Sequence, residues 1–156
     1  MTYSFEKIIS NPRIACSGPL NDISCIVEAE KEIGIFFPPL LKKCIEDFGF
    51  LRIKKKNEDF LVLTGTPDTG LFEDIVLFNP PDNPTRPDDF LVFAWGNENK
   101  NDFACALNPE GRVFMTYNSY LFPFVKNKKR KNADWKISHS SLEEFWQDTV
   151  QRFLDD

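Results

Sequence analysis

The sequence contains few of the residues and motifs on which metal and nucleotide sites depend. Only seven glycines occur in 156 residues, and none belongs to a GxGxxG or GxxxxGKS stretch, which excludes the usual phosphate-binding loops. No CxxC pair occurs, and a single histidine leaves the ligand spacing of a zinc site unfilled. We therefore expect no metal ion and no cofactor. We expect the cysteines to be reduced, mostly buried apolar residues: Cys16, Cys25, Cys44 and Cys105.

The single histidine also restricts the catalytic sites that the chain could form. A Ser-His-Asp triad or a Cys-His pair would have to use His139. No GxSxG nucleophile motif occurs, and nothing in the sequence places a cysteine beside this histidine. We interpret His139 as a surface residue preceding the C-terminal helix, and we expect no catalytic residues.

Long apolar runs and a basic leader are absent as well. No apolar run approaches the roughly 20 residues that span a bilayer. The first ten residues, MTYSFEKIIS, do not show a basic segment followed by an apolar block. We therefore expect a cytoplasmic protein. The net charge of −5 argues against a nucleic-acid partner and is compatible with a basic protein partner.

Phenylalanine, in contrast, is abundant. The chain has 16 phenylalanines, and hydrophobic residues make up 42% of it. A chain of this length can bury a core without disulfides or metals, so we expect one domain, residues 1–156. The many large rings favour an aromatic core between a sheet and helices.

Two helices are predicted near the N-terminus. The first covers residues 23–33, with Asp22 as its N-cap and Gly34 just past its end. The second begins at Pro38 and Pro39, where a missing backbone N–H costs least. Its apolar residues repeat at i, i+3, i+4 and i+7: Leu41, Cys44, Ile45 and Phe48.

A third helix is predicted near the C-terminus. Ser141 and Glu144 form a capping box, with the serine at the N-cap and the glutamate at N3. The residues that follow the 3.6-residue period are Leu142, Phe145, Trp146, Thr149, Val150 and Phe153.

The middle of the chain changes to strand-like patterning. Six short apolar runs (FLRIK, DFLVLTG, EDIVLFN, DFLVFAW, DFACAL and RVFMTY) are separated by Gly, Pro, Asn and Asp. NPEG, residues 108–111, predicts a type I turn joining the last two runs. Helices, then strands, then a helix predict an α+β fold: an antiparallel sheet of about five to six strands flanked by two N-terminal helices and one C-terminal helix.

Glu30 is unusual because it falls on the apolar stripe of the first helix. A buried carboxylate there could be a general acid or base. It could instead anchor the corner between the helices by accepting hydrogen bonds from the first N–H groups of the second helix. A buried charge without a partner would be costly, so both interpretations require one, and we favour the anchor. The stripe itself consists of Ile23, Ile26, Val27 and Ile33.

Several polar runs allow more than one interpretation. NENKND, residues 97–102, lacks the alternating oxygen ligands and terminal glutamate of a calcium loop. RIKKK, residues 52–56, is predicted at a strand end or hairpin tip, where lysines protect a sheet edge. KNKKRK, residues 126–131, could be a nuclear signal or a nucleic-acid patch, but without aromatic residues between the charges a solvated loop is favoured. Trp95 is either part of a recognition surface or the last core residue of its strand.

Three stretches resemble the SUKH superfamily. ISCIVEAEKEIGIFFPPLLKKCIEDFG is similar to the family's opening signature of a helix, an lGi-LP corner and a second helix. FLVFAWGNENKNDFACALNPEGRVFMT is similar to its strand, polar turn and D-x-x-G-x-V hairpin, with Asn108 where an acid is often found. SLEEFWQDTV matches the closing helix. The residues in matching positions are Ile26, Glu30, Ile33, Gly34, Phe37, Pro38, Gly111 and Val113.

The resemblance implies a binding role without catalytic residues, with Glu30, Gly34 and Pro38 as structural anchors. Bacterial members are mostly immunity proteins that neutralise polymorphic toxins, often nucleases, by direct binding. Fungal relatives regulate cell-wall synthesis and signalling through protein contacts. We therefore expect a secreted toxin as protein partner and no membrane. The alternatives are a scaffold or signalling domain and a small hydrolase dependent on His139.

The predicted partner surface combines acidic loops at strand ends with an aromatic anchor. The acids would attract a basic toxin and speed association, while the aromatic residue would supply contact energy. The residues assigned to it are Asp82, Asp88, Asp89, Glu98 and Asp102, with Trp95 or Phe103 as the anchor.

Overall fold

A computed structural model describes residues 12–16, 24–49, 51–63, 79, 86–87, 89–117, 124–125, 128–129 and 134–154 of the chain. The expected strand EDIVLFN lies outside these residues, apart from Asn79 at its end, and so do Asp22 as N-cap and the predicted partner-binding residues Asp82 and Asp88. None of the described helices is long and apolar enough to cross a membrane.

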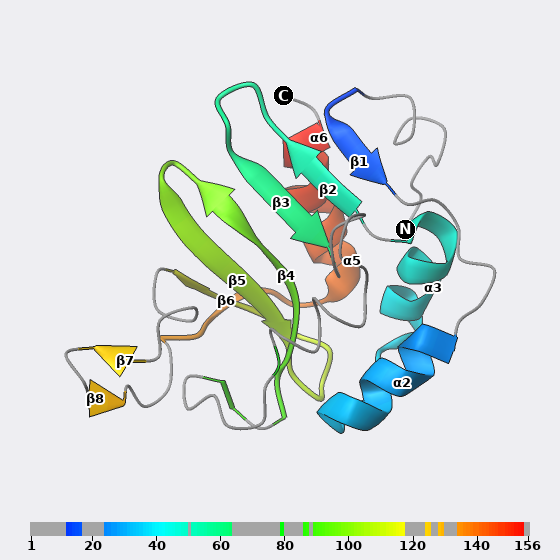
Figure 1. The fold of residues 1–156 in the computed structure, drawn as a ribbon. Helices are drawn as coiled ribbons and strands as arrows, with labels where there is room; N and C mark the ends of the chain where they lie inside the picture. The colour runs from blue at the N-terminus through cyan, green and yellow to red at the C-terminus, as the bar shows by residue number, and fades with distance from the viewer. Residues whose placement is uncertain are drawn as a thin grey trace.

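An antiparallel sheet of seven strands forms the centre of the molecule, in the order β1-β2-β3-β4-β5-β6-β9 (Figure 1). The predicted α+β fold with an antiparallel sheet and helices at both ends of the chain is confirmed. The two edge strands, β1 and β9, were not predicted, since they span only three and four residues. The strands are β1 (Ile14–Cys16), β2 (Leu51–Lys54), β3 (Phe60–Leu63), β4 (Leu91–Glu98), β5 (Asn101–Leu107), β6 (Val113–Tyr117) and β9 (Lys136–His139).

The helices bury their apolar faces against one face of this sheet. Figure 1 shows α2 (Ser24–Ile33) and α3 (Pro39–Phe48) side by side at the right and the C-terminal helical segment behind β2 and β3. Their apolar residues share one core with those of the sheet. Aromatic rings join the layers: Phe48 stacks on Trp146 with 5.9 Å between ring centroids, and Phe93 meets Phe145 edge to face at 5.2 Å. A smaller apolar cluster on the opposite face contains Val62, Val92, Trp95, Ala104 and Ala106.

The C-terminal helical segment has the predicted buried face and one feature that periodicity did not reveal. It consists of α5 (Leu142–Phe145), a π-helical turn η1 (Trp146–Val150) and α6 (Gln151–Leu154). A π-helical turn adds a residue per turn, yet all six residues expected on the apolar face are buried. The capping box forms, because the Glu144 N–H donates to Ser141 Oγ at 3.1 Å. The Glu144 carboxylate, however, accepts hydrogen bonds from Ser140 and not from the Ser141 N–H. The Ser140 N–H donates at 2.7 Å and the Ser140 hydroxyl at 2.5 Å.

The Glu144 carboxylate makes the folding stability depend on pH. The two hydrogen bonds from Ser140 lower the pKa of Glu144 below its ordinary value of 4.5. A lowered folded-state pKa means that the stabilisation is complete above the unfolded-state pKa and is lost as the pH falls through the folded-state pKa. We expect Glu144→Gln to be less stable than the wild type at pH 7, and the difference to shrink as the pH falls below about 4.5. Urea unfolding between pH 3 and pH 7 measures this. Glu46→Gln, on the exposed face of α3, corrects for the loss of one charge, and a difference that stays constant with pH contradicts the prediction.

The hairpin between β4 and β5 is tighter than the sequence indicated. The NENKND stretch was expected to be a turn, but the strands continue into it and only Asn99 and Lys100 form the connection. Both have positive φ angles, 53° and 66°. Two consecutive left-handed residues define a type I′ turn, whose twist matches that of the strands.

Lys100 is an unfavourable residue for this turn. Asn-Gly is the preferred pair of a type I′ turn, because glycine adopts positive φ without steric cost. We expect Lys100→Gly to raise the free energy of unfolding by about 1 kcal/mol, measured by urea denaturation. The matched control is Lys136→Gly on the exposed edge strand β9, which we expect to lower stability by about 0.5–1 kcal/mol. Equal effects of the two substitutions would contradict this assignment of backbone strain.

Two predictions about basic runs are revised. RIKKK does end at the tip of the β2–β3 hairpin, where the Lys55 N–H donates to the Asp59 carbonyl at 2.7 Å. Its lysines do not protect a sheet edge, because β1 pairs with β2 on the outside. KNKKRK was expected to be a loop, but Lys128–Lys129 form β8, which pairs with β7 (Phe124–Val125). Figure 1 shows these two strands apart from the main sheet.

Candidate functional site

A hollow of about 730 Å³ lies where the helix corner approaches the β5–β6 turn. One wall is the segment between α2 and α3, the other is the β5–β6 turn, and the ends of β4 and β5 form the floor. We call it the corner groove. Its lining residues are Gly34, Ile35, Phe36, Phe37, Pro38, Pro39, Asp89, Leu91, Leu107, Asn108, Pro109, Glu110 and Gly111.

A buried carboxylate holds the first wall in place. Glu30, only 8% exposed, accepts a hydrogen bond from the Phe37 N–H at 2.6 Å, and its oxygen lies 3.4 Å from the Lys42 ammonium of α3. Gly34 ends α2 with a φ of 83°, and its N–H donates to the Glu30 carbonyl at 2.8 Å. The anchor was expected to accept from the first turn of α3. It accepts instead from a residue before that helix, so it fixes the corner segment itself.

The corner presents two neighbouring phenylalanines in opposite directions. Phe37 is 3% exposed and belongs to the main core, whereas Phe36 is 86% exposed at the rim of the groove. The Glu30 bond to the Phe37 N–H fixes which of the two rings faces solvent. A phenylalanine so fully exposed gains almost nothing for folding, so its ring is available to a binding partner.

The opposite wall is the predicted NPEG turn. The Gly111 N–H donates to the Asn108 carbonyl at 3.0 Å, and Asn108 Oδ1 accepts from the Arg112 N–H at 2.9 Å. Gly111 has a φ of 81°, which glycine adopts without strain. The Asn108 N–H also donates to the Arg112 carbonyl at 3.1 Å. The turn prediction is confirmed, and these hydrogen bonds of Asn108 make this wall rigid.

The floor is apolar, and the chain entering it is fixed by a buried arginine. Leu91 and Leu107 pair across β4 and β5 and are almost fully buried. Arg86, 6% exposed, donates to the Phe90 carbonyl at 2.8 Å, and the Phe90 N–H donates to the Pro87 carbonyl at 3.0 Å. These bonds position Asp89 at the mouth of the groove.

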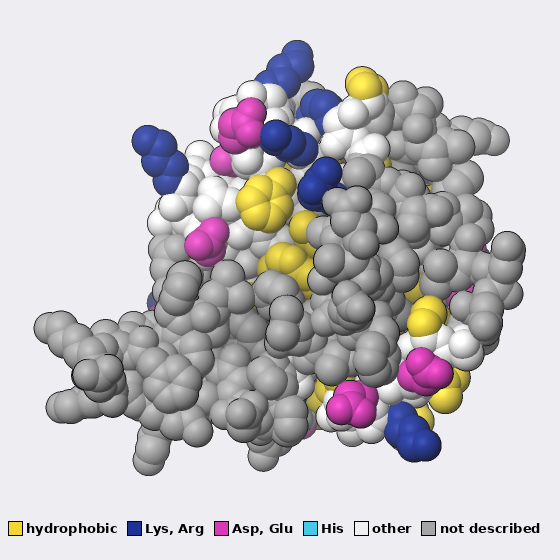
Figure 2. Space-filling view, viewed as in Figure 1, with side chains coloured by type: hydrophobic (Ala, Val, Ile, Leu, Met, Phe, Trp, Pro, Cys, Tyr) yellow, Lys and Arg dark blue, Asp and Glu magenta, His cyan; other side chains and the backbone are white. Residues whose placement is uncertain are grey.

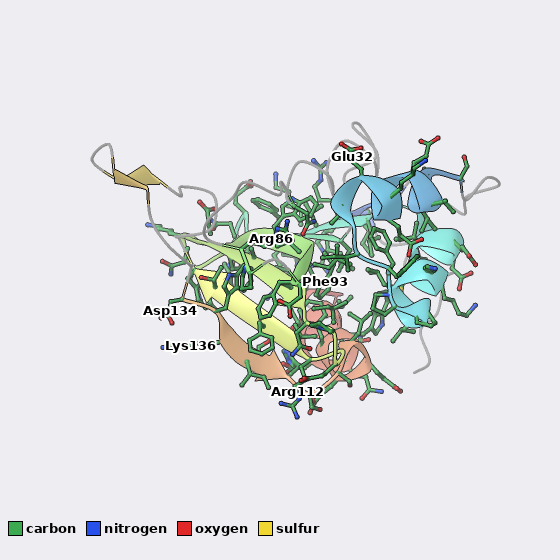
Figure 3. The ribbon with its side chains drawn as sticks, turned by 90° about the horizontal axis from the view of Figure 1, so that it is seen from below. Glu32, Arg86, Phe93, Arg112, Asp134 and Lys136 are labelled. Atoms are coloured by element: carbon green, nitrogen blue, oxygen red, sulfur yellow. The ribbon has the colours of Figure 1, made fainter. Side chains whose placement is uncertain are left out.

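Negative charge lines the rim. Asp89 and Glu110 are exposed and lie at the start of β4 and on the β5–β6 turn. Glu110 also accepts a bond from the Asn108 side-chain amide at 3.3 Å. No lysine or arginine belongs to the described lining: Lys42 pairs with Glu30, and Figure 3 shows Arg112 pointing away from α2 and α3. The groove therefore combines an apolar floor, one exposed ring and two carboxylates.

The described residues of the partner surface expected from the sequence do not share one surface. Trp95 and Phe103 were proposed as the aromatic anchor, but they are 8% and 4% exposed and belong to the two cores. Of the two interpretations of Trp95, the core residue is confirmed, although β4 continues three residues beyond it. Asp89 lies two residues before β4 and Glu98 at its far end, and the seven intervals of the strand alone span roughly 23 Å at about 3.3 Å per residue.

The end of the sheet that carries Glu98 and Asp102 is not an acidic surface. Glu98 pairs with Arg152, and Asp102 accepts a bond from the Asn97 side chain at 2.8 Å. Figure 2 shows Lys and Arg side chains gathered over the tips of the β2–β3 and β4–β5 hairpins. Among the described residues at the hairpin tips and on α6, five basic side chains accompany four acidic ones, Glu58, Asp59, Glu98 and Asp102; the basic ones are Lys54, Lys55, Lys56, Lys100 and Arg152.

His139 precedes the C-terminal helical segment as expected, but its side chain is not exposed at the surface. It ends β9 with only 10% of its side chain exposed, and its ring meets Phe145 edge to face at 5.5 Å. Its Nε2 lies 2.7 Å from Asp148 Oδ2, and its Nδ1 lies 3.0 Å from Ser138 Oγ. Asp148 belongs to η1, so this pair ties the edge strand to the C-terminal helical segment.

The described cysteines form no disulfide with each other. Cys25 and Cys44 are half-buried on their helices, and Cys105 is fully buried in β5. Burial raises the pKa of the Cys105 thiol far above its ordinary value. Such a thiol stays protonated and unreactive.

Sequence reasoning missed Phe36 and Glu110 as site residues. Both were visible, Phe36 beside the double proline and Glu110 inside the predicted turn. Neither belongs to a periodic segment, so no pattern indicated which way its side chain points. Comparison with known proteins adds no assignment, since no protein-family model, characterised protein or solved structure matches this chain.

Proposed function

We propose that this chain is a non-enzymatic protein-binding domain that receives a segment of a partner protein in the corner groove. The observation that carries the proposal is the 86% exposure of Phe36 on a corner held by the buried Glu30 bond. Large aromatic residues on rigid backbone dominate the energetics of protein interfaces. A groove of about 730 Å³ beside such a ring offers room for partner side chains.

The partner we propose is a polymorphic toxin, which this protein neutralises as an immunity protein. The support is the resemblance of the corner and hairpin stretches to the SUKH superfamily, because the two stretches supply the two walls of the groove. The proposed mechanism is occlusion: the bound domain covers the active cleft of the toxin. Carboxylates at the rim would speed association with a basic nuclease.

The test is binding and protection with toxins encoded beside this gene. We expect one of them to bind the wild-type protein and to lose its toxicity on co-expression. Phe36→Ser should weaken binding at least tenfold, since it removes the exposed ring. Ile137→Ser is the matched control, because Ile137 is 56% exposed on β9, away from the groove, and its loss should leave affinity unchanged.

Two results would contradict the proposal. Equal binding by wild type and Phe36→Ser would remove the groove from the interface. Failure of every neighbouring toxin to bind, together with capture of a host signalling protein that requires Phe36, would assign the domain to scaffolding.

A further inference from the structure

We infer that the corner groove selects a partner segment in which a large apolar side chain lies next to lysine or arginine. The inference rests on the proposed function and specifies what the groove recognises. Its first support is the exposed apolar part of the lining: Phe36 is 86% exposed, and Pro39 and Pro109 are exposed as well. The floor residues Leu91 and Leu107 are apolar and almost fully buried. An aliphatic or aromatic side chain placed in the groove would be removed from water mainly by the Phe36 ring and the two prolines.

The second support is the placement of charge at one end of the groove. Asp89 lies two residues before Leu91, and Glu110 lies three residues after Leu107, with which Leu91 pairs, so both carboxylates lie at the same end of these strands. A bound segment would therefore meet two carboxylates near the apolar contact. An anionic segment would face like charges at both positions, which lowers its affinity relative to a basic one.

The third support is the absence of a competing cation within the described lining of the groove. No lysine or arginine belongs to it. Lys42 is occupied by Glu30 at 3.4 Å, and Arg112 is directed away from the helices (Figure 3). A basic side chain of the partner is thus the group that can neutralise Asp89 and Glu110.

The experiment uses a library of random 12-residue peptides displayed on phage, selected against the full chain. We expect enriched peptides to carry Phe, Leu, Ile or Trp within about two residues of Lys or Arg. An enriched peptide is then synthesised and its affinity measured by fluorescence anisotropy at low and high salt. Affinity should fall with added salt, because the charge contacts are exposed.

Charge reversal separates the role of the two carboxylates from that of net charge. We expect the double variant Asp89→Lys with Glu110→Lys to bind the basic peptide at least tenfold more weakly. A fresh selection against this variant should enrich acidic peptides instead. Glu28→Lys with Glu143→Lys is the matched control. It changes net charge equally at exposed sites outside the groove lining and should leave the peptide affinity within twofold.

Three outcomes overturn the inference: enriched peptides that lack a basic residue, equal weakening by both double variants, and concentration-dependent self-association that Phe36→Ser abolishes. The last would show that a second copy of this chain fills the groove. Failure of the inference and of the proposed function can be told apart. A toxin that binds through Phe36 but ignores charge reversal contradicts only the inference. Basic peptides bound without any toxin partner contradict only the immunity role.

Discussion

Glu30→Ala is expected to lower the free energy of unfolding by about 2–3 kcal/mol. The substitution leaves the buried Phe37 N–H without its acceptor at 2.6 Å and removes the charge that Lys42 faces at 3.4 Å. A buried donor without a partner loses its hydration and gains nothing in return, which sets this magnitude. Urea denaturation monitored by tryptophan fluorescence measures it. Binding through Phe36 should weaken as well, since the same bond orients the corner.

Two variants separate the hydrogen bond from the charge. Glu30→Gln keeps an oxygen acceptor and loses only the ion pair with the partly exposed Lys42, so we expect a cost of about 1 kcal/mol or less. Glu32→Ala removes an exposed carboxylate from the same helix and should change stability by less than about 0.5 kcal/mol. If Glu30→Ala proves as mild as Glu32→Ala, the corner is not held by this carboxylate.

Gly96→Ala is expected to destabilise the fold by about 3 kcal/mol or to prevent folding. Gly96 lies in the central strand β4, paired with Leu61 on one side and Phe103 on the other. A methyl group there would overlap the Phe60 carbonyl oxygen and lie 2.8 Å from Cζ of Phe103. The carbonyl belongs to the sheet backbone and cannot move aside without breaking pairing, so the sheet itself must distort.

The control for this prediction is Gly111→Ala. Gly111 has a φ of 81°, but a methyl group added to it meets nothing within 4 Å. Its substitution therefore carries only the cost of positive φ, about 1 kcal/mol. Gly96→Ala should be clearly more damaging, as judged by urea unfolding or, if the variant does not fold, by its solubility on expression. Similar costs for both would show that crowding at Gly96 is relieved by small shifts.

Local signals predicted the elements that carry strong periodicity or special turn residues. The apolar stripe of α3, the capping box of the C-terminal helical segment and the NPEG turn follow from side chains a few positions apart. The stripe predicted for α2 is confirmed at Ile26, but it is wrong at Val27, which is 58% exposed. The anchor at Glu30 could be predicted for the same reason: a charged residue on an apolar stripe needs a partner, and the next helix begins only a few residues later.

The strand ends were harder to predict, because sheet pairing overrides local composition. NENKND is polar throughout, yet all but two of its residues belong to β4 or β5. The strands stay paired up to Glu98 and Asn101, and only Asn99 and Lys100 form the turn. The edge strands β1 and β9 are too short to show alternation. The exposure of His139 was predicted wrongly. Its partner Asp148, 2.7 Å away, lies nine residues further along the chain in the π-helical turn, which no local pattern indicated.

The sequence by itself determined the α+β class, the proline corner with its interior acid and the turn that faces it, because each depends on neighbours close in the chain. Only the tertiary structure decided which acids share a surface. It separated Asp89 from Glu98 by the length of β4, buried Trp95 and Phe103, and placed Asp89 in the same groove lining as Phe36 and Glu110. The physical reason is that a binding surface is made by packing segments distant in sequence, and the direction of an aperiodic side chain is set by that packing alone.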